Sequence, residues 1–401
     1  MLTAIKAHKN SLWALKRAIL FLFFIMLLVS CRREYDEVKH QRIKTVNTSD
    51  TINIAVIWDQ AVKDFMLVEG VMLAADEINA QGGLRGRKLK IKVFYSKNNA
   101  HERWLAKKVA KDVSFAAIIG HRSSANAIAA SIVYEYYGLL FVSPSASNNN
   151  LTNHGFAYTF RTIPSDGYVS KKFAALMKMH GHKSIAIIDD RGVYGKALAD
   201  GVMESLSDIG LKTVVRRHYT PGMTDFKPLC ADLERYDFDA IFLGGTIPRA
   251  AIFIREALQM GIKQRFYGAA AMDLRALERI AGKEANGTVI STYFNPDLDN
   301  PLTRKFVENF KIRHGKPPEW RAALGYDSLK ILFEAMKRSK SAEPSVVAAN
   351  MRFIKDWQGV SGSYTFNLQG DLVNKESYFQ YIDQTGYKYF DAPSENKEKV
   401  D

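Results

Sequence analysis

Apolar positions along the chain follow two periods, one typical of strands and one typical of helices. Short apolar runs such as residues 52–57 and 139–142 have the length of buried strands, whereas residues 69–79 space their apolar side chains as a helix does. After the strand expected at residues 89–94 the cycle of strand and helix repeats at least five times. This alternation predicts an α/β protein with two doubly wound parallel-sheet lobes.

Three stretches interrupt the cycle where the chain is expected to pass between the lobes, near residues 162–166, 288–293 and 359–363. Three crossings make a hinge that can close over a ligand. The predicted domains are lobe 1 at 51–164 plus 293–361, lobe 2 at 165–292 plus 362–390, and a loose polar tail at 391–401.

The first 50 residues differ from the rest of the chain. Basic residues precede an uninterrupted apolar run at 18–29, which is short for a membrane span and typical of a signal-peptide core. The run ends in Leu-Val-Ser-Cys, which looks like a bacterial lipobox with Cys31 as the lipidated residue. We therefore expect a lipoprotein signal peptide at 1–30 and a tether at 31–50, with an uncleaved signal anchor as the alternative.

Two neighbouring strands are expected to end in serine-rich loops. Ser124 follows the apolar run that ends at Gly120, and Ser145 and Ser147 follow the run at 139–142. In an open parallel sheet, ligands bind beyond the carboxyl ends of the strands, where loops and helix N-termini supply N–H groups. Ser124 and Ser147 are the first candidates for ligand contacts, although serine also caps helices.

The chain is basic, with a formal net charge of +14 over 401 residues. Its Lys and Arg residues are scattered rather than clustered with aromatic residues, so no nucleic-acid partner is expected. Attraction to anionic lipid or cell-wall polymers explains the positive net charge as well as nucleic-acid binding would. The two cysteines, Cys31 and Cys230, occur in different contexts, and no structural disulfide is expected.

Motifs for enzymatic chemistry are not found in the sequence. It contains neither a Walker A pattern nor a G-x-S-x-G nucleophile elbow. His180 and His182 lack Cys or acidic partners at metal-ligand spacing and are interpreted as a solvated turn. We therefore expect no catalytic residue, no metal and no cofactor.

From about residue 52 to residue 390 the sequence resembles the leucine/isoleucine/valine-binding type of periplasmic solute receptor, the class I periplasmic binding protein fold. The resemblance rests on eight motifs in the family's order: ADEINAQGGLRGRKLKI, IIGHRSSA, FVSPSAS, FRTIPSD, IAIIDDRGVYGKALADG, YTPGMTDF, DAIFLGG and GYDSLKILFEAMK. Each motif alone is weak, and the ordered set is specific to the fold rather than to the ligand.

The resemblance implies roles for individual residues. In amino-acid-binding relatives, the hydroxyl residues at the positions of Ser124 and Ser147 hold the ligand carboxylate, and Ser145 lies in the same loop. The tyrosine matched by Tyr194 approaches from the second lobe and helps to close the cleft. The alternative for Tyr194 is a ring that only packs against the hinge side of its helix.

Two departures from the family pattern put the usual ligand in doubt. Relatives that hold an α-ammonium group place an acidic residue where this chain has Ala270, and Asp59 or Asp273 is a conceivable substitute. The segment from Trp58 to Ala61 replaces the small, glycine-containing loop that is common in the family after the first strand. Trp58 either stacks on the ligand or fills the cleft wall. Thr246 lies where some relatives have an aromatic residue. An ordinary neutral amino acid is therefore in doubt, whereas the carboxylate end of the site is kept.

Together these features predict a lipid-anchored extracytoplasmic receptor that closes on a small polar, carboxylated solute. The resemblance implies an ABC-type permease as the partner that receives the solute, and the lipid on Cys31 as the link to a membrane, inner or outer. Two alternatives stay open from the sequence: a ligand-sensing subunit of a membrane receptor, and an envelope scaffold that has kept the fold and lost the ligand.

Overall fold

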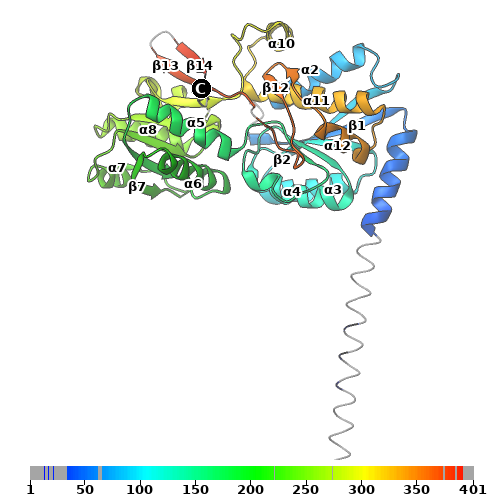
Figure 1. Cartoon of the computed structure of the whole chain (residues 1–401), viewed down its shortest axis with the longest axis horizontal. Coiled ribbons are helices and arrows are strands. Elements are labelled where there is room, and N and C mark those ends of the chain that lie inside the picture. The colour runs from blue at the N-terminus through cyan, green and yellow to red at the C-terminus, as the bar shows by residue number, and fades with distance from the viewer. Residues whose placement is uncertain are drawn as a thin grey trace, which may run out of the picture.

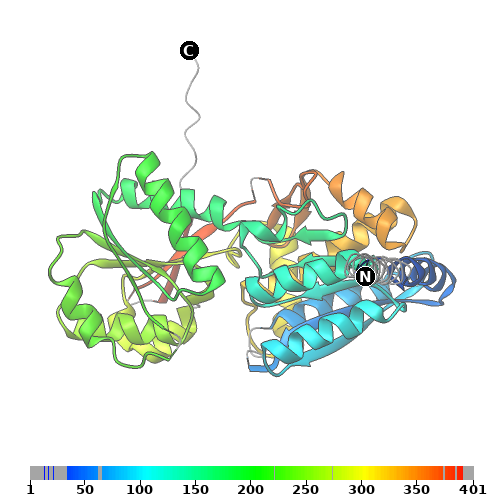
Figure 2. The same ribbon diagram turned by 90° about the horizontal axis from the view of Figure 1, so that it is seen from below.

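The computed structural model describes residues 34–61, 66–220, 222–272, 274–373, 375–383 and 386–391, together with Trp13, Arg17 and Phe21. The chain forms two lobes that lie side by side (Figure 1), and the view from below shows the same division (Figure 2). Apart from those three residues, the predicted signal peptide lies outside the described residues, as does Cys31. Of the tail predicted at 391–401, Asp391 is the last residue of a strand and residues 392–401 lie outside the described residues.

Lobe 1 is built on a five-stranded parallel sheet in the order β2-β1-β3-β4-β5. Side chains alternate between the two faces of a strand, and both faces of a parallel sheet are usually covered. In β1, Ile54 and Val56 pack with α2, α11 and α12, whereas Ala55 and Ile57 pack with α3 and α4. The elements are β1 (Thr51–Asp59), α2 (Leu67–Ala80), β2 (Lys88–Ser96), α3 (Asn99–Lys111), β3 (Phe115–Gly120), α4 (Ser124–Tyr137), β4 (Leu140–Ser143), η2 (Asn149–Leu151), β5 (Thr159–Arg161), α11 (Trp320–Ser339) and α12 (Pro344–Arg352).

Lobe 2 is built on a seven-stranded sheet in the order β14-β13-β10-β9-β8-β6-β7, whose last two strands along the chain run antiparallel. In β6, Ile185 and Ile187 pack in the core cluster that contains α5 and α6, and Ala186 and Ile188 pack in the one that contains α7 and α8. The elements are α5 (Asp166–Met179), β6 (Ser184–Asp189), α6 (Val193–Asp208), β7 (Lys212–His218), α7 (Lys227–Leu233), β8 (Ala240–Gly244), α8 (Arg249–Gln259), β9 (Arg265–Gly268), η3 (Ala270–Met272), α9 (Leu274–Ala281), η4 (Gly282–Ala285), β10 (Val289–Thr292), β13 (Tyr378–Asp383) and β14 (Gly386–Asp391).

The predicted fold class is confirmed: helices flank mostly parallel sheets in two lobes. The chain passes from β5 to α5 at residues 162–165 and leaves the lobe 2 sheet again after β10, from where it continues into α10 (Pro301–His314). The turns between strands and helices on facing ends of the two sheets therefore lie close to these crossings.

The third crossing differs from the expectation that lobe 2 resumes at residue 362. Strands β11 (Trp357–Gly359) and β12 (Gly362–Tyr364) form a short hairpin, and the chain after it stays on lobe 1. Phe366 lies 5.5 Å from Phe160, ring centre to ring centre, in the core of lobe 1. The Gly370 carbonyl accepts a hydrogen bond from Arg161 N at 3.0 Å. The apolar side chains of this segment hold it on lobe 1, and the crossing follows residue 372.

The segment expected to be a tether is also different, because residues 34–48 are helical. This N-terminal helix packs on lobe 1 through Arg42, whose side chain is fully buried. The Arg42 guanidinium donates hydrogen bonds to the carbonyls of Asp112 at 2.8 Å and Phe115 at 2.7 Å, and also to that of Ala110. Tyr35, Val38 and Val46 also pack against the cores of lobe 1, so apolar contacts accompany the polar one and the expected tether is corrected to a docked helix.

Candidate functional site

A small cavity of about 130 Å³ lies where strand ends of both lobes meet. Its wall combines residues of the β3–α4 and β4–β5 loops of lobe 1 with residues that follow β8, β9 and β10 in lobe 2 and with the start of α6 and α11. The lining residues are Arg122, Ser123, Ser124, Ser145, Ser147, Ile163, Tyr194, Thr246, Ala270, Ala271, Tyr293, Trp320 and Arg321.

On the lobe 1 side, the serine after β3 that caps α4 is not the one expected to bind ligand. The Ser123 hydroxyl accepts a hydrogen bond from Asn126 N at 3.3 Å and so serves as the N-cap. Ser124 is the first residue of α4, is 3% exposed and lines the cavity. Ser145 Oγ donates to the Arg122 carbonyl at 3.1 Å, which ties the two serine loops together.

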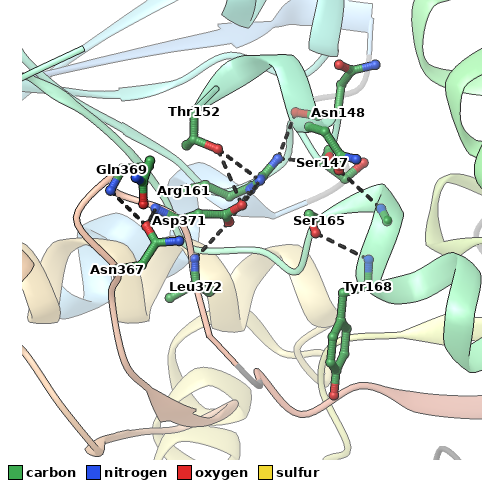
Figure 3. Close-up of polar contacts among 12 residues, drawn as sticks. Ser147, Asn148, Thr152, Arg161, Ser165, Tyr168, Asn367, Gln369, Asp371 and Leu372 are labelled. Atoms are coloured by element: carbon green, nitrogen blue, oxygen red, sulfur yellow. Dashed lines mark hydrogen bonds and ion pairs between the residues drawn. The ribbon is translucent and has the colours of Figure 1, made fainter. Parts of the chain in front are cut away.

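Ser147 is held in place from behind by Arg161, as Figure 3 shows. The Arg161 side chain is fully buried and donates from Nη1 to the carbonyls of Ser147 at 2.9 Å and Asn148 at 2.7 Å. Asp166 N donates to the Ser147 carbonyl at 2.7 Å. These contacts fix the backbone of the loop and leave the Ser147 side chain in the cavity wall.

Asp166 lies directly behind Ser147 and is buried. Burial raises the pKa of Asp166 to about 6, although a hydrogen bond with Ser147 and the charge of Arg161 act in the opposite direction. Its carboxyl group is also close enough to Tyr194 and Tyr293 to influence their ionisation. Asp166 is therefore a titratable group that lies beside the site but not in its wall.

On the lobe 2 side, α6 brings Tyr194 into the cavity wall one residue after the helix begins. Burial raises the pKa of Tyr194 well above its usual range, so its hydroxyl keeps its proton and can donate a hydrogen bond. Gly195 allows α6 to approach the sheet, because a Cβ there would lie 2.3 Å from the Gly244 carbonyl oxygen. A further hydrogen bond joins the lobes beside the cavity, from Asn148 Nδ2 to the Val193 carbonyl at 3.3 Å.

Six of the seven predicted ligand residues come together in this wall, namely Ser124, Ser145, Ser147, Tyr194, Thr246 and Ala270. Trp58 does not. It is fully buried in the core of lobe 1 with Ile54 and Val56. These three residues have the same parity in β1, and alternate residues of a strand face the same side. The indole therefore packs under α2 and α11 rather than in the cleft, which corrects both readings of Trp58.

The two acids considered as substitutes for the missing acidic residue are not found in the cavity wall. The Asp59 carboxylate accepts a hydrogen bond from Arg122 Nε at 3.1 Å and another from Ala61 N at 2.9 Å. Asp273 lies outside the described residues. Ala270 N donates to Ser291 Oγ at 3.2 Å, so the position of Ala270 is defined by its backbone.

Two arginines, Arg122 and Arg321, line the cavity and were not among the residues expected there. Arg122 adjoins the serines of its motif and could have been noticed there. No local sequence pattern marks Arg321 as a site residue, because it lies on the first turn of α11, more than 150 residues after Ser147. Arg321 is 3% exposed, and its guanidinium carbon lies 4.1 Å from the ring centre of Trp320.

Several groups around the cavity can bind an anion. Its described lining contains two arginines and no carboxylate, although Arg122 is paired with Asp59. Helices α4, α6 and α11 all begin at the cavity, through Ser124, Tyr194 and Trp320. The N-terminus of a helix carries a partial positive charge and N–H groups that bind anions. Neither α6 nor α11 has a side-chain cap bond on its first turn.

Other binding chemistry has less support in the described part of the chain. His180 Nδ1 and His182 Nε2 both lie within hydrogen-bond distance of Tyr267 Oη, at 2.6 and 2.8 Å, so the pair is more than a solvated turn. No group of three or more His, Cys, Asp or Glu able to hold a metal occurs among the described residues. None of the described helices is long and apolar enough to cross a membrane.

Comparison with known proteins agrees with the fold and with the cleft. Residues 56–387 match the periplasmic binding protein family. The chain is 28% identical over 335 residues to the leucine-, isoleucine-, valine-, threonine- and alanine-binding protein of Pseudomonas aeruginosa, covering 81% of this chain and 88% of that protein. It is 31% identical over 326 residues to Leu/Ile/Val-binding protein homolog 1 of Brucella suis, covering 80% and 86%.

Among solved structures, an ABC transporter substrate-binding protein from Desulfitobacterium hafniense in complex with Leu superposes with a TM-score of 0.77. The two chains are 29% identical over 85% of this chain and 100% of the other. Such relatives are extracytoplasmic solute-binding proteins and not enzymes. The two sheet lobes, the cleft between their strand ends and these similarities show that the chain belongs to the periplasmic binding protein family, as a class I member of the Leu/Ile/Val-binding type.

Proposed function

We propose that this protein is a receptor for a small carboxylated solute, which binds between the two lobes and is delivered to an ABC permease. The observation that carries the proposal is that Ser124 and Ser147 of lobe 1 and Tyr194 of lobe 2 line one cavity. Two hydroxyl groups, helix N-termini and a protonated tyrosine are suited to the oxygens of a carboxylate.

Closure follows from the division of these contacts between the lobes. A ligand that contacts Ser147 and Tyr194 together interacts with both lobes only when the cleft is closed. It therefore stabilises the closed form by the difference between its affinities for the two forms. The permease would recognise the outline of that closed form, and the names of the relatives support this partner.

We further propose that Cys31 carries the lipid that links the receptor to a membrane. Residues 34–48 are helical and are docked on lobe 1 through Arg42. A lipid on Cys31 would thus hold lobe 1 close to the bilayer. Replacing Cys31 with Ser should move the protein from the membrane fraction to the soluble fraction, and retention in the membrane would contradict the lipid anchor.

Thermal unfolding tests the receptor function directly. The full chain in detergent is screened against amino acids, small carboxylates, amides and polyamines. A ligand present at 100 times its dissociation constant stabilises the protein by about 2.7 kcal/mol, which shifts the midpoint by a degree or more in a chain of this size. A shift confined to carboxylates supports the proposal. No shift across the panel would contradict it and favour a scaffold that has lost its ligand.

A further inference from the structure

One face of lobe 1 combines exposed basic side chains with exposed apolar ones. Helices α3 and α4 lie on the same side of the lobe 1 sheet, where they share a core cluster with Ala55 and Ile57 of β1. The sides of the two helices that point away from the sheet therefore form one surface, which we call the α3–α4 face. Its exposed residues include Arg103, Trp104, Lys107, Lys108 and Lys111 of α3 and Ala125, Ile132 and Tyr136 of α4.

Helix α3 gives this face an excess of positive charge. Four basic side chains are exposed between Arg103 and Lys111, whereas the one acid of α3, Glu102, is buried. The edge strand β2 adds to the charge on the same side of the sheet. Lys92 Nζ lies 5.4 Å from the ring centre of Phe94, which packs against the core under α3 and α4.

The N-terminal helix does not cancel this charge. Glu34 forms an ion pair with Lys111 at 2.7 Å, so one cation of α3 is matched by an acid of the neighbouring helix. The charges of the helix itself are equal in number: its acids are Glu34, Asp36 and Glu37, and its bases are Lys39, Arg42 and Lys44. The excess charge of α3 therefore remains when the neighbouring helix is included.

Large apolar side chains are exposed beside these cations. Trp104 is 55% exposed and Tyr136 is 56% exposed, and Ile132 is exposed between them in the chain. Lys108 Nζ lies 4.8 Å from the centre of the Trp104 ring. Trp and Tyr side chains are enriched at the interface between membrane and water, and basic side chains are attracted to anionic lipid. The α3–α4 face thus has the composition of a surface that contacts an anionic membrane.

The N-terminal helix brings the predicted lipid to this face. Glu34 contacts Lys111 at the end of α3, and the ring centre of Tyr35 lies 5.2 Å from that of Tyr136 at the end of α4. Figure 1 shows this end of the helix on the side of lobe 1 that carries α3 and α4, and both helices lie toward the viewer in Figure 2. Cys31 precedes Glu34 by three positions, and three residues of chain reach at most about 11 Å. A lipid on Cys31 would therefore enter the bilayer beside the α3–α4 face.

We propose that the α3–α4 face docks on a bilayer that contains anionic lipids, with the cations of α3 at the headgroups and Trp104 and Ile132 at the interface. This inference rests on the proposed lipid on Cys31 and goes beyond it, because an anchor fixes one point and a docked face also fixes the orientation of lobe 1. Each Lys or Arg near an anionic surface favours the docked state about fivefold.

Reconstitution of the full chain into vesicles tests the docking. The vesicles contain phosphatidylcholine alone or phosphatidylcholine with the anionic lipid phosphatidylglycerol, and flotation isolates the protein that they carry. A lysine-acylating reagent is then added, and mass spectrometry gives the rate of modification at each lysine. Lys107 and Lys108 should react about fivefold or more slowly on the anionic vesicles. Salt at about 0.5 M should remove most of this protection, because it screens the charges.

The internal control is the pair Lys305 and Lys311 on α10. Both are exposed, and Figure 1 shows α10 on the opposite side of the molecule from α3 and α4. Their rates should be equal on the two kinds of vesicle. Equal rates at Lys107 and Lys108 as well, in protein that floats with the vesicles, would overturn the docking and leave the lipid anchor standing.

A double variant tests the apolar part of the face. Trp104→Ser with Ile132→Ser should lower the salt concentration at which half of the protection at Lys107 and Lys108 is lost. The matched control is Leu302→Ser with Ile312→Ser, which removes exposed apolar side chains from α10 and should leave that concentration unchanged. Equal effects of the two double variants would overturn the role of the apolar side chains in docking.

Two further outcomes would also overturn the inference. Protection that follows the ratio of protein to lipid rather than the content of phosphatidylglycerol would assign the face to a second copy of the chain. Protein that floats with neither kind of vesicle would reject the docking and the anchor together. Ligand-induced thermal stabilisation in detergent tests the receptor function separately, because the cavity lies between the lobes and its lining includes none of the exposed residues of the α3–α4 face.

Discussion

Arg161 and Asp371 form a two-point ion pair, in which the arginine is fully buried and the aspartate partly exposed, although they lie 210 positions apart in the chain. Arg161 Nε donates to Asp371 Oδ1 at 2.9 Å, and Nη2 donates to Oδ2. The same guanidinium donates to the Ser147 carbonyl, so the pair connects the segment after β12 to the ligand loop (Figure 3). The loop that binds the proposed carboxylate is thus supported by a part of the chain expected in the other lobe.

Asp371→Ala should destabilise the protein and loosen the Ser147 loop. The substitution leaves the fully buried Arg161 charge without its counterion, which costs about 3 kcal/mol or more. The urea concentration at the midpoint of unfolding should be lower in the variant. The variant should also bind the ligand more weakly. The exposed pair Arg304–Asp299 provides the control, since Asp299→Ala should cost no more than about 1 kcal/mol. Equal effects of the two variants would argue against a supporting role for Asp371.

Ser124→Ala and Ser147→Ala should each weaken binding of a carboxylated ligand by about 1 to 3 kcal/mol, because each removes a hydrogen-bond partner in a buried site. Calorimetric titration measures the change. Ser131→Ala is the control, since Ser131 is buried in the same helix as Ser124 and its hydroxyl donates to the Ile128 carbonyl, away from the lining residues. Unchanged affinity in both cavity variants would remove this site assignment.

The stability of the protein should fall as the pH rises from about 4 to 6, through Asp166. Its pKa is raised from 3.8 to about 6, so the folded state binds the proton more tightly than the unfolded state does. The contribution of Asp166 to the free energy of unfolding is complete below its pKa in the unfolded state. It is lost as the pH rises through its pKa in the folded state. A shift of about two units corresponds to roughly 3 kcal/mol.

Comparison with Asp166→Asn isolates this effect. The difference in free energy of unfolding between the unchanged protein and Asp166→Asn should change by about 3 kcal/mol between pH 4 and 7, because asparagine does not titrate. Anion binding should also tighten in the unchanged protein as the pH falls through 6, since protonation removes a negative charge behind Ser147. A pH-independent difference between the two proteins would exclude a titrating Asp166.

Arg42→Met should undock the N-terminal helix from lobe 1 while leaving the cavity intact. The substitution leaves the carbonyls of Ala110, Asp112 and Phe115 without this donor, and burial of unpaired polar groups costs about 1 to 3 kcal/mol each. Hydrogen exchange should accelerate throughout residues 34–48, with ligand affinity unchanged. Lys111→Gln, which breaks the exposed contact with Glu34, should have little effect. Slow exchange in Arg42→Met would contradict the docking role.

Local patterns in the sequence were enough to predict the class of the fold and most of its helices and strands. Alternation of Ile54 and Val56 with Ala55 and Ile57 predicts a strand with both faces covered, and the structure confirms it. The position of the serine loops at strand ends also follows from the local pattern, because each loop comes directly after an apolar run. In a parallel sheet the strands end at one edge, so Ser124 and Ser147 meet once the order of strands is correct.

The distant residues that complete the site became apparent from the three-dimensional packing. Arg321 reaches the cavity because α11 packs on α2, and Asp371 reaches Arg161 because Phe366 anchors its segment in the core of lobe 1. Neither position has a local pattern that marks it. Trp58 shows the opposite case, since its parity with Ile54 and Val56 already indicated the core face. Periodicity thus specifies which face a side chain takes, whereas long-range packing specifies what that face meets.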